Sequence, residues 1–249
     1  MEEFLSLIKN SNIIITGTSS GIGKELAIKF LKQGNTVWGC ARNRSTINKN
    51  NYFHKKLDLS DTKQIKKWID EVEKESNKKV DVLISNAAVF TRKLNPLDSF
   101  DAISETIKVN LIAPMLMTNM ISKFMIQNKK GLIVLFSSAA AIISDLKLPI
   151  SLTIGTSSYA SSKAGLETFG QILRKELEKF NIKVATIRVL HTPTKLSDKL
   201  SIKEVKILKS KFKSDKFGNP EKIFKEINKL YDLKKISKNN LFSDELKND

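Results

Sequence analysis

A tyrosine and a lysine four residues apart are the side chains in this sequence best suited to proton chemistry. Tyr159 and Lys163 lie in a stretch whose pattern predicts a helix over 158–180. Residues four apart share one face of a helix, so the phenol and the ammonium group are expected to point into the same space. A nearby cation stabilises a phenolate and lowers the phenol pKa, so Tyr159 is expected to act as an acid or base near neutral pH. The spacing alone is weak support in so lysine-rich a chain.

A glycine-rich loop near the N-terminus is typical of a phosphate site. We expect Gly17 to allow a sharp turn, Gly21 to let the backbone approach a pyrophosphate, and Gly23 to permit close contact between helix and strand. The helix that starts here would offer free N–H groups and the positive end of its dipole to the phosphates. The residues expected to contact the cofactor are Gly17, Thr18, Ser19, Ser20, Gly21, Ile22 and Gly23.

Short apolar runs alternate with longer amphipathic stretches along the chain. Strands are expected at Asn12–Thr16, Thr36–Cys40, Tyr52–Leu57, Val80–Ser85, Leu132–Ser137 and Ile182–Val189, and helices near 22–33, 61–76, 98–128, 158–180 and 196–213. Several runs are almost wholly apolar, as in strands covered on both faces. The alternation predicts a single α/β domain over 1–249, with a Rossmann-type, doubly wound parallel sheet flanked by helices. Ligands on such a sheet bind at the carboxyl ends of its strands.

The loop spacing resembles the TGxxxGxG loop of the classical short-chain dehydrogenase/reductase family. The resemblance extends over about Asn12 to Thr194, and more weakly through 218–221. It implies a catalytic set of Asn110, Ser138, Tyr159 and Lys163, with Ser137 as the alternative serine. In the family, the asparagine holds a water of the proton relay and the serine hydrogen-bonds the substrate oxygen.

The resemblance also implies a reaction. A nicotinamide hydride would add to a carbonyl carbon while Tyr159 donates a proton to its oxygen, and Lys163 would also hold the nicotinamide ribose. Tyr159 and Lys163 are therefore expected among the cofactor contacts, and the substrate is expected to be a small carbonyl compound or secondary alcohol. The alternative is a regulatory or non-redox protein that binds NADP(H) without turnover.

The end of the second expected strand favours NADP(H) over NAD(H). A carboxylate there would bind the ribose hydroxyls of NAD, but family alignments place the neutral Ala41 at this position, followed by Arg42. A guanidinium pairs bidentately with a phosphate; alternatively, Arg42 is a solvated loop residue. By resemblance, Asp58 contacts adenine (or caps the helix starting near 60–61). The remaining cofactor contacts implied by the family are Asn86, Ala87 and Thr194.

Three departures from the family leave the substrate open. The separation of Ser138 and Tyr159 is longer than in many members, and its segment 146–154 alternates apolar and polar positions, which predicts a half-buried strand. That strand would wall the substrate pocket or contact another subunit. Val189 and Leu190 replace the family's Pro-Gly before a substrate loop at about 190–215, and the charged residues 232–249 leave the last strand in doubt. Helices 98–128 and 158–180 resemble those that pair in family oligomers, so a homodimer or homotetramer is expected.

The composition excludes several other classes. The net charge is +17, but only five basic residues are arginines, the residues best suited to reading bases and phosphates, so a nucleic-acid partner is not expected. Cys40 is the sole cysteine, which fits a reducing compartment. The N-terminus lacks a signal-peptide pattern, and the most apolar run, Leu132–Phe136, is too short to span a bilayer. We therefore expect a cytoplasmic protein with no membrane partner and no metal site.

Overall fold

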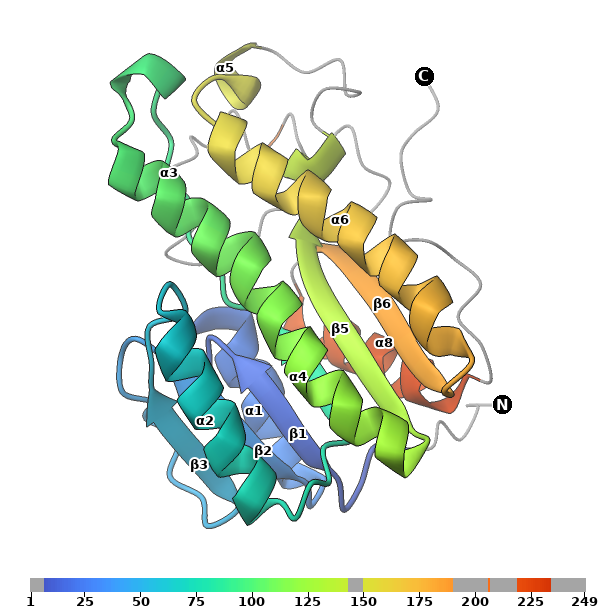
Figure 1. Cartoon of the computed structure of the whole chain (residues 1–249). Coiled ribbons are helices and arrows are strands. Elements are labelled where there is room, and N and C mark those ends of the chain that lie inside the picture. The colour runs from blue at the N-terminus through green and yellow to red at the C-terminus, as the bar shows by residue number, and fades with distance from the viewer. Residues whose placement is uncertain (1–6, 143–149, 190–205, 207–218, 234–249) are drawn as a thin grey trace.

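A six-stranded parallel sheet forms the centre of the molecule (Figure 1). The computed structural model describes residues 7–142, 150–189, 206 and 219–233. The strand order is β3-β2-β1-β4-β5-β6, so the direction of winding reverses between β1 and β4, the switch point beside which ligands of such sheets bind. The strands are β1 (Asn12–Thr16), β2 (Thr36–Ala41), β3 (Tyr52–Lys56), β4 (Val82–Ser85), β5 (Gly131–Ser138) and β6 (Ile182–Val189). The predicted parallel α/β fold and all six predicted strands are confirmed.

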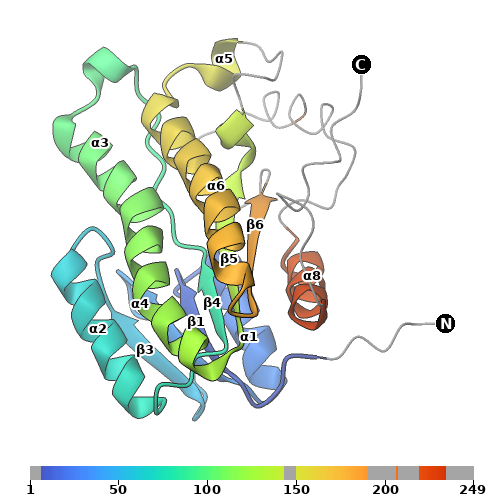
Figure 2. The same ribbon diagram turned by 45° about the vertical axis from the view of Figure 1, so that its right-hand side comes forward.

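Helices cover both faces of the sheet (Figure 2). One face packs against α2 (Thr62–Glu75), α4 (Ala113–Asn128) and α6 (Ser157–Glu178). The other face packs against α1 (Gly21–Lys32) and α8 (Pro220–Asp232). Because the central strands are covered on both sides, every residue of β4 is buried, which explains why the sequence shows no alternation there.

A wide turn interrupts the long helical run predicted over 98–128. Ser99 caps α3 (Phe100–Ile107) by accepting a hydrogen bond from the Ala102 N–H, and a π-helical turn, η2 (Lys108–Ile112), joins α3 to α4. Such turns are frequent at functional sites. In the part of the chain that the structure describes, the run Phe100–Asn128 is the one helix long and apolar enough to cross a membrane. Its most apolar window is 56% buried, in keeping with a core helix of the fold.

The region before α6 differs from its sequence prediction. Residues 143–149 lie outside the described residues, but Ile150–Thr153 forms a short helix, α5, so the predicted strand is wrong for this part. The Ile154 N–H donates to the Ile150 carbonyl at 2.9 Å, so the backbone meets its hydrogen-bonding needs locally, without a neighbouring strand. Two short 3-10 turns, η1 (Asn95–Leu97) and η3 (Ala139–Ile142), complete the described elements.

The C-terminal part of the chain contains a helix that the sequence patterns did not predict. Helix α8 is absent from the predicted helices, although Asn219 caps it by accepting from the Glu221 N–H at 2.9 Å. The predicted helix over 196–213 lies outside the described residues apart from residue 206, and residues 234–249 lie outside them entirely.

Candidate active site

The glycine loop between β1 and α1 has the geometry expected of a phosphate cradle. Gly17 and Gly21 have φ angles of +80° and +59°, which favour glycine. A Cβ added at Gly23 would lie 2.5 Å from both the Gly17 carbonyl oxygen and the Asn86 Nδ2, so only glycine fits this contact. Ser20 precedes α1 without a side-chain cap, so its hydroxyl does not occupy the N–H groups of the first turn. The residues present therefore fit a dinucleotide phosphate bound at this helix end.

The loop is fixed to the neighbouring strands through Thr16 and Thr18. The Thr16 hydroxyl accepts hydrogen bonds from the N–H groups of Asn86 and Ala87 at 3.0 and 2.9 Å, and the Asn86 side chain donates to the Thr16 carbonyl at 2.9 Å. The buried Thr18 hydroxyl accepts from the Tyr52 hydroxyl at 2.8 Å. Asn86 and Ala87 thus lie directly against the glycine loop, while the Thr18 side chain points toward β3.

Arg42 and Asp58 lie beyond the ends of β2 and β3. Arg42 is 60% exposed and forms an ion pair with Glu105 of α3 at 2.7 Å. Asp58 accepts a hydrogen bond from the Ser60 N–H at 2.8 Å. The alternative role considered for Asp58, capping α2, is wrong, because Asp61 caps that helix by accepting from the N–H groups of its first turn.

Tyr159, Ser138 and Lys163 come together at the carboxyl end of β5. Ser138 is the last residue of β5, and its side chain lies close enough to the Tyr159 phenol to lower the pKa of that phenol. Tyr159 and Lys163 are only 8% and 3% exposed, and the Lys163 Nζ lies 5.9 Å from the centre of the Tyr159 ring. The Lys163 ammonium donates to the Phe136 carbonyl at 2.7 Å. Ser137, the alternative serine, instead faces the Lys163 carbonyl at 3.5 Å.

Burial sets the proton affinities of this site. It raises the pKa of Tyr159, and the nearby Ser138 hydroxyl opposes that effect. The prediction that a nearby cation lowers this pKa is therefore wrong for the structure described, because desolvation penalises a phenolate more than its neighbours stabilise it. Burial also lowers the pKa of Lys163 to about 8, opposed by the negative charge of Glu167. At neutral pH the phenol is protonated and the ammonium group is charged.

Asn110 connects α6, the helix that carries Tyr159, to the segment that follows β4. It is fully buried in the π-helical turn, where its Oδ1 accepts from the Val89 N–H at 2.8 Å. Its Nδ2 donates to the Val89 carbonyl at 2.9 Å and to the Ser162 hydroxyl at 3.2 Å. The Ser162 hydroxyl in turn donates to the Tyr159 carbonyl at 2.7 Å. Asn110 thus connects the segment after β4 with the helix that carries Tyr159.

Three neighbours of this centre were missed by the sequence analysis. The Phe90 ring packs edge-on against the Tyr159 ring, with the centroids 4.8 Å apart. Glu167, one turn beyond Lys163 on α6, forms a bidentate ion pair with Arg188 of β6. The four-residue spacing of Lys163 and Glu167 was visible in the sequence, but Arg188 lies in a different predicted element, a strand, and gave no such indication. Thr194 lies outside the described residues, as does the substrate loop except residue 206.

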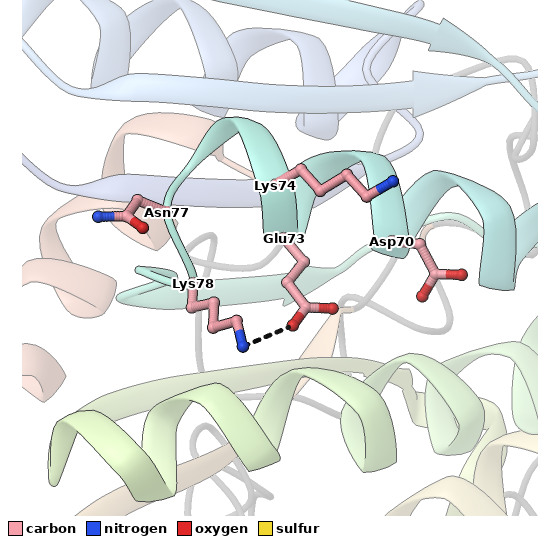
Figure 3. Close-up of a pocket in the computed structure, with 5 residues that line it drawn as sticks. All are labelled: Asp70, Glu73, Lys74, Asn77 and Lys78. Atoms are coloured by element: carbon pink, nitrogen blue, oxygen red, sulfur yellow. Dashed lines mark ion pairs between the residues drawn. The ribbon is translucent and has the colours of Figure 1, made fainter.

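A hollow at the C-terminal end of α2 lies apart from the candidate active site. It is lined by Asp70, Glu73, Lys74, Asn77 and Lys78, with an ion pair between Glu73 and Lys78 at 3.6 Å (Figure 3). Helix α2 starts at the carboxyl edge of a parallel sheet and ends at the amino edge, so this hollow lies opposite the glycine loop and Tyr159.

Comparisons with known proteins agree with the geometry. The sequence pattern of the family described as short chain dehydrogenase matches residues 11–204. The 3-oxoacyl-(acyl-carrier-protein) reductase FabG of Buchnera aphidicola is 28% identical over 222 residues, 87% of either chain. A hydroxy(phenyl)methyl-succinyl-CoA dehydrogenase subunit, BbsD of Thauera aromatica, is 30% identical over 230 residues, again 87% of either chain.

The fold has a close counterpart among solved structures. A short chain dehydrogenase from Leptospira borgpetersenii with bound NAD+ superposes with a TM-score of 0.79 at 21% identity, covering 93% of this chain and 89% of that one. Together with the family match over residues 11–204, these findings mean that the chain belongs to the short-chain dehydrogenase family of oxidoreductases.

Proposed function

We propose that the protein is an NADP(H)-dependent oxidoreductase that interconverts a carbonyl compound and its secondary alcohol, with Tyr159 as the proton donor and acceptor. The observation that carries the proposal is the buried group formed by Tyr159, Ser138 and Lys163 at the edge of the sheet where the glycine loop also lies. When bound, the nicotinamide dinucleotide supplies or accepts the hydride.

The chain's own residues handle the proton. Because burial raises the pKa of Tyr159, the phenol is in its acid form at neutral pH, which suits donation to a carbonyl oxygen during reduction. The Ser138 hydroxyl, next to the phenol, would hydrogen-bond that same oxygen and stabilise its developing negative charge. The Lys163 ammonium stabilises the phenolate left behind and would hold the nicotinamide ribose. Through Ser162, Asn110 holds α6 against the segment after β4. A water of the proton relay would bind beside Asn110 and complete the catalytic set.

The glycine loop would hold the pyrophosphate, and Asn86, Ala87, Asp58 and Thr194 the remainder of the cofactor. NADP(H) is favoured because Ala41 places no carboxylate at the end of β2 and Arg42 stands next to it. The exposed pair of Arg42 with Glu105 is weak enough to be exchanged for a 2′-phosphate. A lower Michaelis constant for NADH than for NADPH would contradict this part of the proposal.

The surroundings of the site support further expectations. Both named relatives act on thioester-linked compounds, so 3-ketoacyl thioesters belong among the candidate substrates. Exposed apolar side chains on α4 and α6, namely Met115 and Ile172, support pairing of these helices in a homodimer or homotetramer, which light scattering would measure. We also propose a cytoplasmic protein formed by one domain, without nucleic-acid or membrane partners.

Oxidation of NADPH in the presence of aldehydes, ketones, keto-sugars and 3-ketoacyl thioesters tests the proposal. We expect at least one carbonyl class to be reduced by the wild-type protein. Tyr159→Phe should retain cofactor binding and lose turnover by about 10²–10⁴-fold, because the proton donor is removed. The matched control is Tyr231→Phe on α8, away from the site, which should keep full turnover. Unchanged turnover in Tyr159→Phe would refute the assignment, and cofactor binding without reduction of any carbonyl would favour the regulatory alternative.

A further inference from the structure

One helical turn beyond Lys163, an ion pair between Glu167 and Arg188 is buried in a part of the core that is expected to be apolar. Glu167 is only 5% exposed, and the side chain of Arg188 only 11%. The Arg188 Nε and Nη2 atoms each donate to a different carboxylate oxygen of Glu167, both at 2.6 Å. Burying two charges carries a large desolvation cost, and replacing such a pair by apolar residues is often neutral or stabilising. The fold alone therefore does not require this ion pair.

The pair lies beside the reactive groups on both of its elements. Along α6, Glu167 follows Lys163 by four residues and so occupies the same face of the helix. In β6, Arg188 is in register with Ser137 and precedes Val189, the partner of Ser138. Gly170 allows α6 to lie close to β6, because a Cβ added at this position would be only 2.5 Å from the Thr186 hydroxyl of β6. Thr186 and Arg188 lie on one face of the strand, which brings Arg188 within reach of Glu167.

We propose that Glu167 and Arg188 are positioning residues that act on Lys163 through their charges: the Glu167 carboxylate keeps the Lys163 ammonium charged, and Arg188 both orients that carboxylate and limits its effect. This inference deepens the proposed function and rests on it for its catalytic consequence, although not for its electrostatic one.

The charges around Lys163 make the expected directions specific. Among the described residues, the charged group whose field acts on Lys163 is Glu167, which raises its pKa against the effect of burial. From the same helix the protonated Tyr159 faces Lys163, and from β5 the Phe136 carbonyl accepts a hydrogen bond from its ammonium group. From β6, Arg188 acts through Glu167. Removing Glu167's charge takes away the favourable field and leaves a buried guanidinium unpaired nearby, so the pKa of Lys163 should fall. Removing Arg188's positive charge takes away the cation that offsets the carboxylate's field at Lys163, so the pKa should rise.

Nuclear magnetic resonance of protein labelled at lysine Cε measures this without substrate or cofactor. The Lys163 signal is the one missing in Lys163→Met, and it should titrate in the wild-type protein near pH 8. In Glu167→Gln the midpoint should fall by about one pH unit, and in Arg188→Gln it should rise, because a neighbouring opposite charge shifts a pKa by about 1–3 toward the charged form. Glu176→Gln, an exposed change of the same charge on α6, should leave the midpoint unchanged.

A purely structural ion pair predicts a different pattern, in which both variants are disturbed alike. Midpoints that move in the same direction, or an unmoved midpoint in Glu167→Gln, would overturn the inference. If either single variant fails to fold, the double variant Glu167→Gln with Arg188→Gln removes both charges while keeping side-chain volume. Its midpoint should lie below that of the wild-type protein, and an unchanged midpoint would overturn the inference.

The catalytic consequence is read separately. Carbonyl reduction should decline above the midpoint of Lys163, so the alkaline limb of the kcat profile should move to lower pH in Glu167→Gln and to higher pH in Arg188→Gln. The expected midpoint shifts in a protein that reduces no carbonyl would refute the proposed function and leave this inference standing. Unshifted midpoints in a protein that does reduce a carbonyl would refute this inference and leave the proposed function standing.

Discussion

The two halves of the carboxyl edge hold their functional groups in different ways. In the nucleotide half, beyond β2 and β3, Arg42 is 60% exposed and held by one ion pair. In the reactive half, beyond β4 to β6, Tyr159 and Lys163 are almost fully buried, and Asn110 is fully buried within a network of hydrogen bonds. Exposed pairs exchange partners at little cost, whereas buried groups depend on every partner they have. The first arrangement suits recognition of a ligand that comes and goes, and the second suits a fixed proton donor.

The largest effect should come from titrating Lys163, and it tests whether the reactive half is truly desolvated. Burial lowers the pKa of Lys163 from 10.5 to about 8, so between these values the unfolded chain binds the proton more tightly than the folded one. The contribution of Lys163 to stability is therefore present above pH 10.5 and lost as the pH falls through about 8. We would measure the free energy of unfolding of wild-type and Lys163→Met protein in urea. As the pH rises through this window, the difference between them should change by about 3 kcal/mol in favour of the wild type.

Lys175→Met is the control for that titration, because Lys175 is exposed on the same helix. Its stability difference from the wild type should stay constant over the same pH range. A constant difference for Lys163→Met as well would mean that the reactive half is as well solvated as the nucleotide half.

A smaller effect is expected from cutting the hydrogen bonds that fix α6. Asn110→Ala should reduce the free energy of unfolding by about 2 kcal/mol, because it leaves the N–H and carbonyl groups of the partly buried Val89 without their side-chain partner. Asn119→Ala, on the exposed side of α4, should change it by less than about 0.5 kcal/mol. Equal changes in the two variants, measured by chemical denaturation, would remove the distinction drawn between buried and exposed groups.

The smallest effect on stability should come from the nucleotide half. Arg42→Gln breaks an exposed ion pair, so the free energy of unfolding should change by less than about 1 kcal/mol. Selectivity for NADPH over NADH should nevertheless fall by about tenfold, as expected when one charge-assisted contact to a phosphate is lost. Isothermal titration with both cofactors measures it, and Lys49→Gln in the same exposed loop is the control. An unaltered preference in Arg42→Gln would show that Arg42 is only a solvated loop residue.

The sequence predicts features that depend on local residue patterns, and it misses those that depend on burial and on contacts between elements. All six strands were predicted, most of them because their residues are apolar and covered on both faces, and the glycine loop was predicted because its conformations require glycine. The short helix α5 was mistaken for a strand, because a brief alternation of apolar and polar residues does not distinguish local hydrogen bonding from pairing with a neighbour. The pKa of Tyr159 was predicted in the wrong direction, since spacing reveals a nearby lysine but not the depth of burial. Arg188 was missed because its partner lies on another element, across the turn that follows α6.

Deuteride transfer tests the central claim most directly. Wild-type protein would be incubated with NADPH carrying deuterium at the transferable position of its nicotinamide and with the carbonyl compound identified by the screen. Mass spectrometry should show an alcohol that carries one deuterium on the former carbonyl carbon, and almost none of this product with Tyr159→Phe. An alcohol without deuterium, or the same yield of labelled alcohol from Tyr159→Phe, would contradict the account.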